Sequence, residues 1–153
     1  MPAIKLNSAS FSNGEIPKQF TCDGADRSPA LSWSRVPSAT RSLALVVIDE
    51  DAPFGAFVHW ILYDLPPGKK SLSEGLPHQP QLLDGSRQGL NGFDGVGYGG
   101  PCPPGSSPHR YVFTLYALSI VPTLPPGASE KQLVQAIRTD VLAQGTLVER
   151  YHR

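Results

Sequence analysis

Apolar residues along this chain fall into short runs with the length and residue types of β-strands. The clearest runs cover residues 42–48, 57–63 and 110–118, and each is rich in β-branched or aromatic residues. Weaker candidates are residues 4–6 and residues 30–33, where apolar and polar positions alternate. Sixteen prolines and fifteen glycines are spread between the runs and divide the chain into short segments. This pattern predicts an all-β sandwich.

One helix is predicted near the C-terminus. Ser129 suits the N-cap position, and Glu130 lies in the first turn, where the helix dipole favours an acid. Apolar residues then follow at helical spacing, at Leu133, Ala136, Ile137 and Leu142. Residues 64–97 have turn signals and no clear periodicity, so we expect them to form loops. With 153 residues and no internal repeat or linker, the chain should be a single domain.

Composition excludes several classes of function. The formal net charge is zero and the isoelectric point is near 6.9, so no nucleic-acid partner and no electrostatic membrane binding are indicated. No apolar run reaches the about 18 residues that a membrane span needs, and the N-terminus lacks a signal-peptide pattern. We therefore expect a cytoplasmic protein. Two cysteines, Cys22 and Cys102, are too few for a disulfide framework, so two reduced thiols are expected.

Glycine and proline are unusually dense in residues 98–108. Proline fixes φ and removes backbone donors, whereas glycine permits positive φ and close approach of another group. This composition predicts a loop that is rigid before any ligand arrives. The loop leads into His109, Arg110 and Tyr111, three side chains able to hold an anion, at the start of a predicted strand.

A cluster of acids follows another predicted strand. Asp49, Glu50 and Asp51 come directly after the apolar run 43–48, and Pro53 closes the turn. Carboxylates at a strand end can accept hydrogen bonds from His or Arg or bind a cation, although a solvated acidic turn explains the same residues. His59 lies in the middle of the run 57–63, where it is either a hydrogen-bonded core residue or part of a site.

Together these segments resemble the phosphatidylethanolamine-binding protein family, also called the Raf kinase inhibitor protein family. The resemblance extends over nearly the whole chain, and its most specific blocks are residues 58–60, residues 98–104 and residues 109–113. The Cys-Pro-Pro form of the loop is similar to the bacterial and archaeal branch. The resemblance implies an antiparallel Greek-key β-sandwich with a C-terminal helix. It also implies a small pocket for an anion such as phosphate, acetate or phosphoethanolamine, without a cofactor.

The resemblance assigns roles to individual residues. Arg110 is expected to pair with the acidic turn as structural support. If two histidines lie near a bound phosphate, binding should strengthen as the pH falls through about 6.5. Glu50 stands where the family usually has proline, and residues 136–143 lack the small and histidine residues of bacterial relatives. The expected ligand-binding residues are Asp49, Asp51, Pro53, His59, Gly100, Cys102, Pro104, His109 and Tyr111.

Other functions use the same residues. A hydrolase could employ Cys102 as nucleophile with His59 or His109 as base. A metal site could combine the two histidines with Asp49 or Asp51. A surface-acting inhibitor would not need the pocket at all, and the resemblance itself implies modulation of a kinase or protease. We expect a binding protein rather than an enzyme, and exposed edge strands make a homodimer plausible.

Overall fold

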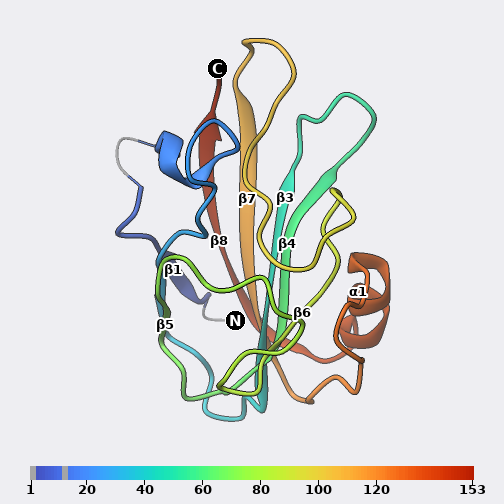
Figure 1. Cartoon of the computed structure of the whole chain (residues 1–153). Coiled ribbons are helices and arrows are strands. Elements are labelled where there is room, and N and C mark those ends of the chain that lie inside the picture. The colour runs from blue at the N-terminus through green and yellow to red at the C-terminus, as the bar shows by residue number, and fades with distance from the viewer. Residues whose placement is uncertain (1–2, 12–13) are drawn as a thin grey trace.

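Two antiparallel β-sheets form the body of the protein. The computed structural model describes residues 3–11 and 14–153. A five-stranded sheet has the order β6-β4-β3-β7-β8, and a three-stranded sheet has the order β1-β2-β5 (Figure 1). The strands are β1 (Lys5–Asn7), β2 (Leu31–Ser34), β3 (Ser42–Asp49), β4 (Phe57–Leu65), β5 (Ser71–Leu72), β6 (Arg87–Gln88), β7 (His109–Leu118) and β8 (Val141–Tyr151). The helical elements are the 3-10 turn η1 (Lys18–Phe20) and the helix α1 (Glu130–Ile137).

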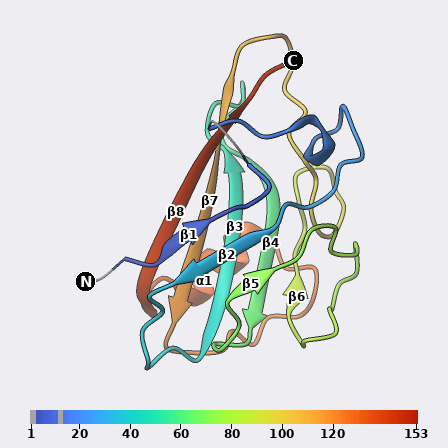
Figure 2. The same cartoon turned by 90° about the vertical axis from the view of Figure 1, so that its left-hand side faces the viewer.

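The central strand β3 is apolar on both faces because each face is covered by another layer. Leu43 and Leu45 pack in the core cluster that includes Trp33 of β2, between the two sheets. Ala44 and Val46 point the other way, into the cluster that includes Leu133 of α1 and its neighbour Ile137. Figure 2 shows the small sheet crossing one face of the large one, and Figure 1 shows α1 at the other. The continuous apolar run at residues 43–48 follows from this double burial.

The sequence-based prediction of a mainly β protein with two antiparallel sheets and a C-terminal helix is confirmed. The helix begins as expected, because the Ser129 side chain accepts from Gln132 N and the Gln132 side chain accepts from Ser129 N. Leu142, however, does not belong to the helix, which ends at Ile137; it lies in β8. The region 64–97 is mostly loop but contains the two short strands β5 and β6.

The strand β8 was not predicted. It pairs along its length with β7, and it crosses the N-terminal segment, where Ile4 N donates to Gln144 O at 3.2 Å. A Cβ atom on Gly145 would lie 2.2 Å from Ile4 O, so glycine is needed at this crossing. Gly145 and the polar residues around it hid the strand pattern. The N-terminal segment covers part of β8, which is an edge strand of the large sheet, so this edge offers less room for a second copy of the chain. The homodimer stays a prediction.

Candidate functional site

Strand register brings the acidic turn and both histidines to one end of the large sheet, the upper end in Figure 1. Asp49, the last residue of β3, lies opposite Phe57 of β4 on one side and Tyr111 of β7 on the other. His59 and His109 are each two positions away from these partners along their strands. Three segments that are distant in sequence therefore meet around Asp49.

His59 is held in one orientation by the glycine-rich loop. The residue is 3% exposed, and its Nδ1 lies 2.6 Å from Gly99 O, while Gly99 N donates to His59 O at 2.9 Å. A carbonyl oxygen only accepts, so Nδ1 carries a proton and Nε2 is the nitrogen left for a ligand. Burial lowers the pKa of His59. The aromatic rings of Phe57, Phe93 and Tyr111 surround it, with centroids 5.1, 5.6 and 5.2 Å away.

His109 contacts the site through Asp49. Its Nδ1 lies 2.6 Å from Asp49 Oδ2, and both side chains are buried. The other oxygen of Asp49 accepts from Asp51 N at 2.8 Å. These bonds fix the Asp49 carboxylate and offset its charge, so the acidic turn is not merely solvated.

Arg110 pairs with Asp51 at the rim. Its Nε donates to Asp51 Oδ2 and a terminal nitrogen donates to Asp51 Oδ1, each at 3.0 Å. Arg110 N also donates to Asp51 Oδ2, at 2.8 Å. The bonds from Arg110 lower the pKa of Asp51 to about 2. Glu50 N donates to Arg110 O at 3.1 Å, which ties the turn to β7 by a bond that the proline expected from the family could not donate.

A pocket of about 160 Å³ opens at this end of the sheet. Its walls are mainly apolar, and Asp49 and His59 are its two polar side chains that can ionise. Of the predicted residues, Asp51, Gly100, His109 and Tyr111 are not among those that line it; Tyr111 packs against both histidine rings. The lining consists of Asp49, Ala52, Pro53, Phe57, His59, Phe93, Cys102, Pro103 and Pro104.

His109 faces a separate outer depression of about 450 Å³, which Asp51, Arg110 and Arg150 also line. The two imidazoles therefore open on different sides of the acidic turn. The sequence missed Phe57 and Phe93 as pocket residues. Phe57 could have been found, because it lies two positions before His59 on the same face of β4. Phe93 gave no signal, since it lies in the loop-like region.

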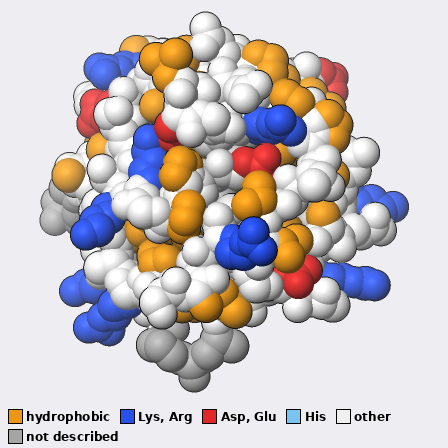
Figure 3. Space-filling view, turned by 90° about the horizontal axis from the view of Figure 1, so that it is seen from below, with side chains coloured by type: hydrophobic (Ala, Val, Ile, Leu, Met, Phe, Trp, Pro, Cys, Tyr) orange, Lys and Arg blue, Asp and Glu red, His pale blue; other side chains and the backbone are white. Residues whose placement is uncertain are grey.

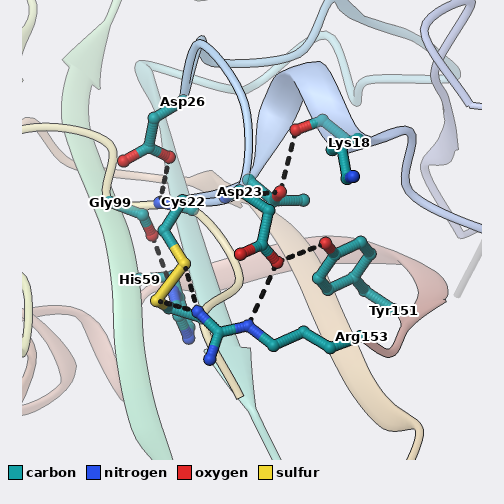
Figure 4. Close-up of a disulfide and its surroundings, with 11 residues drawn as sticks. Lys18, Cys22, Asp23, Asp26, His59, Gly99, Tyr151 and Arg153 are labelled. Atoms are coloured by element: carbon teal, nitrogen blue, oxygen red, sulfur yellow. Dashed lines mark hydrogen bonds and ion pairs between the residues drawn. A yellow bond between two sulfur atoms is a disulfide. The ribbon is translucent and has the colours of Figure 1, made fainter. Parts of the chain in front are cut away.

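The prediction of two reduced thiols is wrong. Cys22 and Cys102 form a disulfide across 80 residues of sequence (Figure 4). The segment after η1 packs directly against the glycine-proline loop: Cys22 N donates to Pro101 O, and Gly100 N donates to Asp26 Oδ1. Periodicity along the chain cannot reveal such a contact. The disulfide also removes the hydrolase alternative, because a disulfide-bonded Cys102 has no thiolate.

The C-terminal residues close over the disulfide. A terminal nitrogen of Arg153 lies 3.2 Å from both sulfur atoms, and Arg153 Nε donates to Asp23 at 3.1 Å (Figure 4). Tyr151 donates its hydroxyl proton to the same Asp23 oxygen at 2.6 Å. The hydrogen bond from Tyr151, followed by that from Arg153, lowers the pKa of Asp23.

The metal alternative finds no support in the arrangement of donors. Within residues 3–11 and 14–153, no three His, Cys, Asp or Glu side chains are grouped so that they could hold a metal ion. Over the same residues, no helix is long and apolar enough to cross a membrane.

Comparison with known proteins places these features in a family. The sequence profile described as phosphatidylethanolamine-binding protein matches residues 7–152, and the chain belongs to this family. A UPF0098 protein of Aquifex aeolicus is 48% identical over 153 residues, which cover 98% of this chain and 89% of the relative. A UPF0098 protein of Methanothermobacter thermautotrophicus is 44% identical, with 98% and 99% covered.

Two solved structures share the fold. The phosphatidylethanolamine-binding protein homolog CT736 of Chlamydia trachomatis has a TM-score of 0.88 and 39% identity, with 99% of this chain and 98% of CT736 covered. Escherichia coli YbcL, described as a member of the mammalian family, has a TM-score of 0.91 and 26% identity, with 99% of each chain covered. The resemblance seen in the sequence is therefore confirmed.

Proposed function

We propose that this protein binds a small anion in the pocket between the acidic turn and the glycine-proline loop. The ligand is a phosphate or carboxylate group, either as a free ion such as phosphate or acetate or as part of a head group such as phosphoethanolamine. The observation that carries the proposal is the fixed ring of His59, whose Nδ1 is occupied by Gly99 while the same residue lines the pocket.

The charge of Asp49 has to be reconciled with an anionic ligand. Its two oxygens accept from His109 Nδ1 and from Asp51 N, so part of the carboxylate charge is already compensated. A phosphate near His59 would in turn favour the protonated imidazole. The amino group of phosphoethanolamine would find an acceptor in Asp49, which gives that head group a partner at each end.

The size and walls of the pocket support a small ligand. Its volume of about 160 Å³ is below the about 300 Å³ at which sites for drug-sized molecules begin. Phe57, Phe93 and the prolines exclude water from the His59 ring, which strengthens a charged hydrogen bond formed there. The family-level expectation of kinase or protease modulation names no residue, so we propose the anion pocket, and not enzyme inhibition, as the function.

The test is an NMR titration of the protein with phosphate and, separately, with phosphoethanolamine. We expect the imidazole signals of His59 to move first, with those of His109 following through Asp49. His59→Ala should raise the dissociation constant by about tenfold to a hundredfold, since a hydrogen bond to a charged group contributes about 1.5–3 kcal/mol. His152→Ala is the matched control, because His152 is exposed and lies outside the pocket.

Acidification provides a second test. Sulfate, whose charge is constant between pH 5 and 8, should bind more tightly as the pH falls across this range, because the anion prefers protonated His59. Sulfate affinity that is flat over this range, or equal affinity in wild type and His59→Ala, would remove the anion pocket as the function.

The disulfide bears on the compartment in which the protein works. Disulfides persist mainly in oxidising environments, and one relative, LppC of Mycobacterium tuberculosis, carries a lipoprotein name at 42% identity. These two observations favour an oxidising compartment over the cytoplasm that the sequence predicted. Thiol trapping in cells of the source organism tests this, since a cytoplasmic protein would be recovered with both cysteines reduced.

A further inference from the structure

A larger cleft lies at the opposite end of the sheet. It has a volume of about 520 Å³ and is formed where the loop after β2 meets the turn after β4. Because β3 begins at Ser42 and ends at Asp49, this cleft and the anion pocket are separated by the length of that strand. Figure 3 views the molecule from this end, where Lys and Arg side chains stand among hydrophobic ones.

Trp33 holds the walls of the cleft in place. Trp33 N donates to Lys70 O at 3.0 Å, and the indole Nε1 donates to Lys69 O at 2.8 Å. The turn itself closes through a bond from Lys69 N to Pro66 O at 3.1 Å. The facing loop closes in the same way, with Thr40 N donating to Pro37 O at 3.1 Å. The cleft is therefore formed without a ligand, which lowers the entropic cost of binding one.

The cleft is cationic. Its lining includes Arg35, Lys69 and Lys70 and no acidic residue. Lys69 pairs with Asp84 at 2.7 Å. For Arg35 and Lys70, no carboxylate lies within 4.0 Å among residues 3–11 and 14–153. Two cations without a protein counter-ion therefore face a cleft whose remaining wall is apolar, from Val36, Pro37 and Pro67.

We propose that this cleft is a second binding site, for a small organic anion that carries a flat apolar group, such as an aryl phosphate or aryl carboxylate. The anionic group pairs with Arg35 and Lys70, and the apolar group covers the proline and valine wall. A volume of about 520 Å³ lies within the range of about 300–1,000 Å³ that is usual for such ligands. This site is independent of the anion pocket and goes beyond the function proposed above.

The probe for this site is 1-naphthyl phosphate, followed by ¹H–¹⁵N NMR. We expect it to shift the indole signal of Trp33 and the amide signals of Lys69 and Lys70. Inorganic phosphate has only the anionic group and 1-naphthol has only the flat apolar group. The dissociation constant of each, measured from these signals, should be at least tenfold higher than that of 1-naphthyl phosphate. The double variant Arg35→Asn/Lys70→Gln should also weaken binding at least tenfold. Asn is chosen because Arg35 has φ +67°, which Asn tolerates.

Two control variants make the result specific. Lys131→Gln/Arg138→Gln removes the same charge from exposed positions of the helical segment and should leave the affinity unchanged. His59→Ala should also leave it unchanged, which separates this site from the anion pocket. The proposal is overturned if the probe shifts only signals around His59 and Phe93, if both charge variants weaken binding equally, or if the probe causes no shift at millimolar concentration.

Discussion

Removal of the disulfide should produce the largest single loss of stability in this protein. The crosslink joins residues 80 positions apart, and the chain-entropy model gives an entropy of about −15 cal/mol/K for a loop of this length, or about 4.5 kcal/mol at 25 °C. That is a large part of the about 5–15 kcal/mol by which domains are stable. The double variant Cys22→Ser/Cys102→Ser is the perturbation, and wild type reduced with dithiothreitol provides an independent route to the same state.

Urea unfolding followed by tryptophan fluorescence measures the effect. With a slope of about 2 kcal/mol/M, a loss of about 4.5 kcal/mol moves the midpoint down by about 2 M. The slope is fitted separately for each form, because a crosslinked unfolded chain is more compact. The reasoning from loop length is refuted if oxidised wild type contains no free thiol and yet its free energy of unfolding differs from that of both uncrosslinked forms by less than about 1 kcal/mol.

The same perturbation should reach the anion pocket. Cys102 lines the pocket, and the backbone around it is tied to the segment after η1 by the bond from Cys22 N to Pro101 O at 3.1 Å. Pro103 and Pro104 have no amide hydrogen, so they cannot donate hydrogen bonds that would replace the S–S bond. Reduced protein that remains folded should therefore bind phosphate more weakly than oxidised protein.

Three further predictions concern single residues. Gly100→Ala should cost about 1–3 kcal/mol in thermal unfolding, because its Cβ would lie 2.3 Å from Asp26 Oδ1, whereas Gly68→Ala, with nothing within 4 Å, should be neutral; equal effects would contradict this. Ser129→Ala should cost about 1 kcal/mol through loss of the capping box, and an unchanged midpoint would show that α1 does not depend on it. The lowered pKa of His59 means that the unfolded chain binds the proton more tightly, so stability should fall as the pH drops below about 6.5. The pH slope should be smaller in His59→Gln; an identical slope would assign the effect to another group.

The predictable parts of the fold are those whose pattern is local. β3 has a layer on each face, so its continuous apolar run was visible in the sequence. The start of α1 was visible because Ser129 is followed by Glu130 and by apolar residues at helical spacing. β8 was not, because Gly145 is determined by a distant neighbour, Ile4 O. The disulfide was missed for the same reason: its partners meet only after η1 packs on the glycine-proline loop.

The candidate site also has one part that the sequence could predict and one part that it could not. Its acidic turn and its two histidines come from neighbouring strands of one sheet, and Asp49 lies in register between Phe57 and Tyr111, so their convergence follows from correct strand pairing. The opposite wall of the pocket comes from Phe93 and Cys102, which lie in segments without periodicity. These segments are positioned by the bond between His59 and Gly99 and by the disulfide. His59 therefore acts at both levels: it is the side chain offered to the ligand and the anchor of the loop that closes the pocket. His59→Ala removes both roles, whereas reduction of the disulfide loosens the wall and leaves the imidazole in place. Comparison of phosphate affinities in these two proteins therefore separates the contribution of the imidazole from that of the enclosure.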